Sequence, residues 1–134
     1  MQSIDIKDWD ILIVDDAKDN LEVAKVILEF QGAEIHTATN GEEGMEVLQN
    51  LEPRLILLDI SMPKMSGDQM LAKIREEPRT KDIPVIAITA HAMKGDRERL
   101  LALGFDGYIA KPFRIDTFLD QIKAALNNIE RKET

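Results

Sequence analysis

The sequence predicts an α/β fold, a doubly wound five-stranded parallel sheet with strand order 2-1-3-4-5. Short apolar runs alternate along the chain with segments whose apolar residues recur at helical spacing. Continuous apolar runs indicate strands covered on both faces, as in a parallel sheet. A length of 134 residues suits one domain with a real core and is too short for two. We therefore expect a single domain over residues 1–134, with a core at about 10–127 and a polar tail at 128–134.

Four of the five expected strands are apolar runs, and the fifth alternates polar with apolar residues. The runs are residues 11–14, 55–58, 85–88 and the weaker 108–110, and the alternating segment is 34–38. Alternation is typical of a strand with one exposed face, so 34–38 is expected at an edge of the sheet.

Five helices are expected between and after these strands, four of them with a start or stop signal. Leu21, Ala24, Ile27 and Leu28 share one face before Gly32, a typical helix stop. The second helix is expected from Gly41 to before Pro53, with Met45, Leu48 and Leu51 on its apolar face. The third starts at Ser66-Gly67 and ends at Pro78. The fourth carries Leu100, Leu101 and Leu103 before Gly104, and the fifth carries Ile115, Phe118, Leu119, Ile122 and Leu126.

Composition excludes several classes of protein. The net charge of −8 argues against a nucleic-acid partner, since phosphate backbones are bound by clustered Lys and Arg. There is no cysteine, so no disulfide framework is possible, and no apolar run approaches the length of a membrane span. We expect a cytoplasmic protein that does not contact membranes.

Chemically strong side chains follow four of the expected strands. Asp15 and Asp16 follow the first strand, Asp59 the third, Thr89 the fourth and Lys111 the fifth. Ligands of open α/β sheets bind beyond the carboxyl ends of the strands, where strand order reverses. The sequence therefore predicts that these side chains meet in one site.

Three carboxylates in one pocket need a compensating charge. Unit charges about 4 Å apart repel by roughly 4 kcal/mol at an effective dielectric near 20. An all-oxygen ligand set favours Mg²⁺ or Mn²⁺. A carboxylate such as Asp59 can also be a covalent nucleophile, with an aspartyl-phosphate as product, and Lys111 and Thr89 can stabilise the phosphoryl oxygens.

At these residues the chain resembles the receiver domains of two-component response regulators, the CheY-like family, of the stand-alone or hybrid-kinase type. The matching pieces, in order along nearly the whole chain, are Ile13-Val-Asp-Asp16, Leu58-Asp-Ile-Ser-Met-Pro-Lys-Met-Ser-Gly67, Ile88-Thr-Ala90 and Ala110-Lys-Pro-Phe113. Ser66 stands where the family usually has aspartate, and serine is also a competent helix N-cap.

The resemblance implies a signalling phosphoacceptor rather than an enzyme. Asp59 would accept a phosphoryl group from a histidine kinase or histidine phosphotransfer protein, with Thr89 and Lys111 assisting. Asp16 would bind the metal directly and Asp15 largely through water, together with Asp59 and the backbone carbonyl of Ser61.

The resemblance also implies a switch that acts on a downstream protein target. Thr89 and Tyr108 would couple the site to the face formed by helix 4, strand 5 and helix 5. A cis peptide would join Lys111 to Pro112. Ser61 and His91 would modulate the phosphoryl lifetime, with slow loss of the phosphoryl group expected.

Plainer interpretations stay open for single residues. Any one of the aspartates alone is typical of a turn or helix cap. Tyr108 fits a packing residue as well as a switch, His91 fits an ordinary surface residue, and His36 fits an edge-strand residue without a role.

Three other functions are alternatives. An aspartate-nucleophile phosphohydrolase of the haloacid-dehalogenase type would carry a second Asp two residues beyond the nucleophile after strand 1, and Ala17 stands there. A flavodoxin-like cofactor binder would need a phosphate loop rich in Ser, Thr and Gly, whereas residues 15–20 carry three carboxylates. A receiver-like module that binds proteins without cycling is the third.

Overall fold

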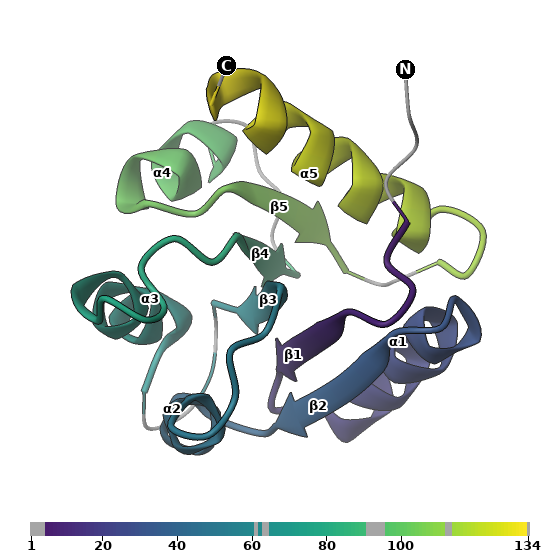
Figure 1. The fold of residues 1–134 in the computed structure, drawn as a ribbon, viewed down its shortest axis with the longest axis horizontal. Helices are drawn as coiled ribbons and strands as arrows, with labels where there is room; N and C mark the ends of the chain where they lie inside the picture. The colour runs from purple at the N-terminus through teal and green to yellow at the C-terminus, as the bar shows by residue number, and fades with distance from the viewer. Residues whose placement is uncertain (1–4, 61, 63–64, 91–95, 112–113, 134) are drawn as a thin grey trace.

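The computed structural model describes residues 5–60, 62, 65–90, 96–111 and 114–133, in which strands and helices alternate (Figure 1). The expected sheet is present, with five parallel strands in the order β2-β1-β3-β4-β5. The elements are β1 (Asp10–Val14), α1 (Lys18–Phe30), β2 (Glu34–Ala38), α2 (Gly41–Leu48), β3 (Leu55–Asp59), α3 (Gly67–Glu76), β4 (Val85–Thr89), α4 (Asp96–Leu103), β5 (Gly107–Ala110) and α5 (Phe118–Glu133). The predicted fold class is confirmed.

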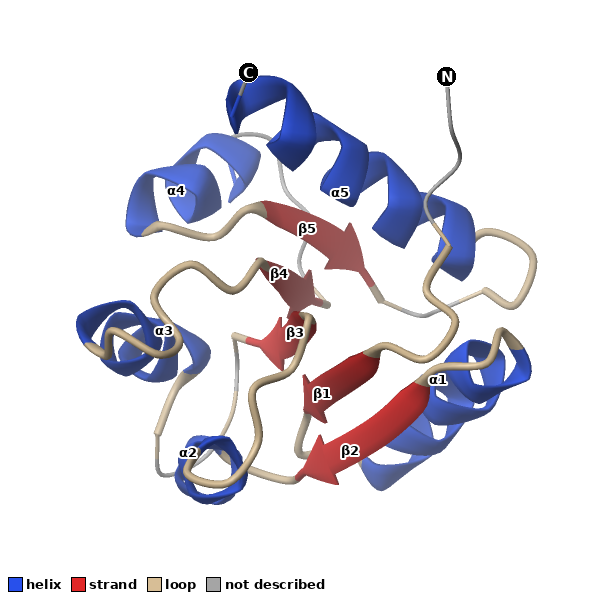
Figure 2. Cartoon of the chain, in the orientation of Figure 1, coloured by secondary structure: helices blue, strands red, loops and turns tan. Residues whose placement is uncertain are grey.

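The sheet separates two apolar clusters, because successive side chains of a strand point to opposite faces. On β1, Ile11 and Ile13 belong to the cluster that α1 and α5 cover. Leu12 and Val14 belong to the cluster that α2, α3 and α4 cover. Figure 2 shows the same division, with α1 and α5 on one side of the sheet and the other three helices on the opposite side. This is the doubly wound arrangement.

β2 is the edge strand that its alternating sequence predicts. It pairs with β1 alone, in the register Asp10↔Glu34 through Val14↔Ala38. Of its residues only Ala38 is fully buried, and Glu34 is exposed. By contrast every residue of the central strands β3 and β4 is buried.

Side-chain caps start two of the helices, and one of them is the serine that the sequence indicated. Ser66 is the N-cap of α3 in a capping box: its hydroxyl accepts a hydrogen bond from the Gln69 N–H at 3.4 Å, and the Gln69 side chain accepts one from the Ser66 N–H at 3.0 Å. Asn40 caps α2 by accepting from the Glu43 N–H at 2.9 Å.

The fifth helix differs from its predicted bounds at both ends. Ile115 precedes α5 in a turn, where the Arg114 carbonyl accepts hydrogen bonds from the N–H groups of Thr117 and Phe118. Its side chain is 80% exposed, so its helical spacing from Phe118 was misleading. At the other end α5 continues to Glu133, so most of the segment expected as a polar tail is helical. The last four residues of the helix, 130–133, are Glu, Arg, Lys and Glu, which are good helix formers and can extend a helix that its earlier turns already anchor.

Two other leucines also fall outside the expected pattern. α2 ends at Leu48, so Leu51 lies beyond it. In α4, Leu100 is buried but Leu103 is 46% exposed. Among the described residues, no helix is long and apolar enough to cross a membrane.

At the amino-terminal end of β4, the Arg75 side chain connects α3 with the segment before β4 and with the turn before β5. Its guanidinium donates to the carbonyls of Lys81 at 2.8 Å, Ile83 at 2.7 Å and Gly104 at 3.0 Å. It also forms an ion pair of 2.8 Å with Asp106. α3 is thereby joined to the segment before β4 and to the turn before β5.

Replacing Arg75 by Met is expected to lower the free energy of unfolding by about 2 kcal/mol, because carbonyls and a carboxylate in a half-buried site lose a charged donor. Arg114→Met is the control, since among the described residues the Arg114 side chain pairs with Asp116 alone, and that side chain is 72% exposed. Urea unfolding followed by circular dichroism measures both. Equal effects of the two substitutions would contradict the structural role of Arg75.

Candidate functional site

The site lies at the carboxyl edge of the sheet, where four strands end together. Asp15 directly follows β1, and Lys111 directly follows β5. Asp59 and Thr89 are the last residues of β3 and β4, because each of these strands ends one residue later than the sequence indicated. Since all strands are parallel, their last residues lie at one edge, with Asp59 paired to Ile88 on β4.

Asp15, Asp16 and Asp59 form an acidic cluster. One carboxylate oxygen from each lies within 4.8 Å of the other two. Asp15 is fully buried and Asp59 is 3% exposed, whereas Asp16 is exposed. The structure thus brings together the three carboxylates that the sequence predicted to meet.

Lys111 supplies the positive charge nearest to this cluster within the described residues. Its Nζ lies 2.9 Å from Asp15 Oδ2 and donates a hydrogen bond of 3.1 Å to Asp59 Oδ2. Burial alone would lower the pKa of Lys111, but the bonds and charges of Asp15 and Asp59 outweigh it and raise that pKa above the usual 10.5. The stabilisation from these pairs is present below the usual pKa and is lost only as pH rises through the raised one. Lys111 is therefore a fixed cation at neutral pH.

The two oxygens of the buried Asp15 carboxylate have different partners. Oδ1 accepts a hydrogen bond of 2.9 Å from the Ala17 N–H. Oδ2 contacts Lys111 as an ion pair, but no described residue gives it an aligned hydrogen bond. Three carboxylates against one lysine leave the cluster with excess negative charge, and its donors are all oxygen. These features fit a divalent cation of the Mg²⁺ or Mn²⁺ type.

Gly67 has a role at this site that the sequence did not reveal. A Cβ at this position would lie 2.4 Å from the backbone oxygen of Asp59 and 2.6 Å from the Cα of Ile60. The Gly67 N–H donates to the Ile60 carbonyl at 3.1 Å. The start of α3 therefore packs directly on the backbone that carries Asp59, and the sequence marked Gly67 only as part of a motif and a helix start.

Thr89 and Tyr108 share one face of the sheet. Thr89 is buried, and Tyr108 is half-buried against the cluster covered by α2, α3 and α4. Tyr108 pairs with Ala87, and Thr89 with Ala110, so the two lie on neighbouring strands. Ser61, His91 and Pro112 lie outside the described residues.

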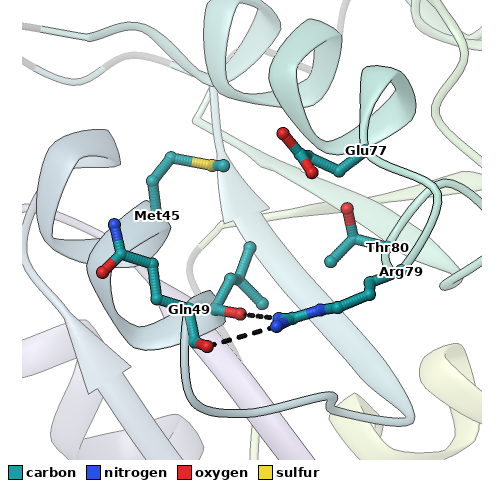
Figure 3. A pocket seen from close by; sticks show the side chains of 6 residues that line it. Met45, Gln49, Glu77, Arg79 and Thr80 are labelled. Atoms are coloured by element: carbon teal, nitrogen blue, oxygen red, sulfur yellow. Dashed lines mark hydrogen bonds between the residues drawn. The ribbon is translucent and has the colours of Figure 1, made fainter.

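A separate hollow lies between α2 and the segment after α3 (Figure 3), and none of the three clustered aspartates lines it. Its volume is about 290 Å³, and it is lined by Met45, Leu48, Gln49, Glu77, Arg79 and Thr80. The Arg79 guanidinium donates to the carbonyls of Leu48 and Gln49 and so caps the end of α2. We therefore assign Arg79 a structural role.

The site and sheet order define a class of protein, and comparison with known sequences agrees. Residues 11–123 match the response regulator receiver domain family, and the chain belongs to this family of signalling domains.

Individual relatives are similar along most of their length. The polar-differentiation response regulator DivK of Brucella anthropi is 36% identical over 118 residues, which cover 88% of this chain and 96% of DivK. The chemotaxis response regulator CheY4 of Vibrio cholerae superposes with a TM-score of 0.83 at 25% identity, over 89% of this chain and 99% of that one. The receiver domain of the sensor histidine kinase PA1611 from Pseudomonas aeruginosa has a TM-score of 0.79 at 28% identity, over 90% and 98%. That structure has a magnesium ion coordinated in its active-site cleft.

Proposed function

We propose that Asp59 accepts a phosphoryl group from the phosphohistidine of a histidine kinase or histidine phosphotransfer protein. The observation that carries the proposal is the meeting of Asp15, Asp16 and Asp59 within 4.8 Å, with Lys111 bonded to Asp59. An isolated surface aspartate has neither neighbouring carboxylates nor a bonded lysine. A Mg²⁺ or Mn²⁺ ion would be held by Asp16 directly, by Asp15 largely through water, by Asp59 and by the backbone carbonyl of Ser61.

The step is a transfer between two nucleophiles. A carboxylate oxygen of Asp59 forms a bond to phosphorus, the bond from phosphorus to the imidazole nitrogen breaks, and its electron pair stays on the imidazole. Lys111 remains beside the carboxylate as a cation, and the Thr89 hydroxyl donates a hydrogen bond to a phosphoryl oxygen. A divalent ion held by the acidic cluster would further compensate the charge on those oxygens.

The proposed output runs through Thr89 and Tyr108 to the surface of α4, β5 and α5. Thr89 would move toward the phosphoryl group, and the Tyr108 ring would follow it because both lie on the same sheet face. A downstream protein target would read the new position of Tyr108. Ser61 and His91 are proposed to set the phosphoryl lifetime.

Incubation with acetyl phosphate and Mg²⁺ tests the proposal. Intact-mass spectrometry is expected to show one added phosphoryl group per chain, and chelation of the metal by EDTA is expected to abolish the gain. Without the ion, the entering phosphate would meet an acidic cluster for which the described residues offer Lys111 as the only nearby counter-charge. No gain with Mg²⁺, or an equal gain after chelation, would refute the proposed chemistry.

Lys111→Met is expected to tighten Mg²⁺ binding by about tenfold, because a cation at 2.9 Å and 3.1 Å from two of the carboxylates competes with the metal. Lys73→Met, at an exposed position of α3, is the control and should leave the affinity unchanged. Isothermal titration calorimetry measures both. Weaker Mg²⁺ binding in the Lys111 variant would show that the lysine organises the carboxylates instead of competing.

A further inference from the structure

A second group of ligating side chains lies at the opposite end of β1 from the acidic cluster. Asp10 begins β1, and Glu34 and His36 lie on the neighbouring edge strand β2, which Figure 2 shows beside β1. The register pairs Asp10 with Glu34 and Leu12 with His36. Since Leu12 belongs to the cluster covered by α2, α3 and α4, all three side chains project from that face.

The three ligand atoms are already close. One atom from each side chain lies within 4.8 Å of the other two. His36 Nε2 lies 3.0 Å from Asp10 Oδ1. Ligand atoms on a tetrahedral Zn²⁺ are about 3.3 Å apart, given metal–ligand distances near 2.0 Å. The His36–Asp10 pair therefore matches one edge of such a site, and only the exposed Glu34 side chain has to move inward.

The charges around this group favour a cation. Two carboxylates face one imidazole, and among the described residues Asp10 has no ion pair other than His36. The Glu34 side chain has no hydrogen bond or ion pair to any described residue, although its backbone N–H is bonded to Trp9. The Asp10 and His36 side chains are 37% and 36% exposed, so an ion can reach them from solvent.

The ligand types separate this group from the first cluster. Carboxylates alone suit Mg²⁺, whereas an imidazole with two carboxylates suits a borderline metal such as Zn²⁺. We propose that Asp10, Glu34 and His36 bind one Zn²⁺ ion, with solvent water in the remaining position. The ligands come from two strands, so bound zinc would link the edge strand β2 to β1. This site does not depend on the proposed phosphoacceptor function.

Calorimetric titration with Zn²⁺ in a large excess of Mg²⁺ tests the site, because Mg²⁺ competes better for an all-carboxylate group such as Asp15, Asp16 and Asp59 than for a group with an imidazole ligand. The expected result is saturable binding of one Zn²⁺ per chain. His36→Gln is expected to weaken it by about tenfold or more, and Asp10→Asn likewise. His91→Gln, which removes the other histidine of the chain, and Asp59→Asn, which alters the first cluster, should leave it unchanged.

Thermal melting provides a second measurement that does not depend on calorimetric heat. Zn²⁺ should raise the melting temperature of the wild-type chain and of the Asp59→Asn and His91→Gln variants, but not that of His36→Gln. Absence of saturable Zn²⁺ binding would leave Asp10 and His36 as an ordinary ion pair and overturn the proposal. Binding that survives His36→Gln but disappears in Asp59→Asn would place the zinc in the first cluster and overturn it equally.

Discussion

Asp59→Asn is expected to abolish phosphoryl uptake from acetyl phosphate, leaving the intact mass unchanged under conditions in which the wild-type chain gains one phosphoryl group. The amide is nearly isosteric with the carboxylate but is neutral and a poor nucleophile. It also removes one of the three charges that would hold the metal, and it replaces the charged acceptor of the Lys111 hydrogen bond at 3.1 Å with a neutral amide. The loss should therefore be complete rather than partial.

Asp82→Asn is the matched control for this substitution. Asp82 is exposed and precedes β4, at the opposite edge of the sheet from Asp59. Its variant should be phosphorylated at the wild-type rate, and circular dichroism should show that both variants are folded. Phosphorylation that persists in Asp59→Asn would move the acceptor to another residue, and peptide mapping would identify it.

The fold could be predicted because its signals are local. β3 and β4 are buried along their whole length and appear in the sequence as continuous apolar runs. Parallel strands then fix which residues meet, so Asp15, Asp59 and Lys111 could be placed together without knowing a single distance. Only the ends of elements were uncertain, as at α5, because a turn residue such as Ile115 can keep helical spacing by chance.

Other features could not be predicted because they depend on segments that are distant in sequence. The Arg75 guanidinium donates hydrogen bonds to the carbonyl of Gly104 and to the carboxylate of Asp106. In the sequence, Arg75 looks like any exposed arginine of a helix, so these contacts could not be predicted. The proximity of Asp10 to His36 requires the register of β1 on β2, and His36 on its own indicated only an edge strand.

Gly67→Ala is expected to lower the free energy of unfolding by about 2 to 3 kcal/mol, which is large for the addition of one methyl group. The added Cβ would lie 2.4 Å from the Asp59 oxygen and 2.6 Å from the Ile60 Cα. Both are backbone atoms of a buried segment, so relief requires α3 to move away from β3. Since that backbone carries the Asp59 side chain, the rate of phosphorylation by acetyl phosphate should fall as well.

Gly104→Ala separates crowding from backbone strain. Gly104 has a φ of +110°, but a Cβ there meets only Leu71 Cδ2 at 3.6 Å, an ordinary contact. The expected cost is about 1 to 2 kcal/mol from the left-handed backbone alone, with phosphorylation unchanged. Urea unfolding and the acetyl phosphate reaction compare the two variants. If Gly67→Ala proved no more destabilising than Gly104→Ala and reacted at the wild-type rate, the close packing of α3 on β3 would not be what positions Asp59.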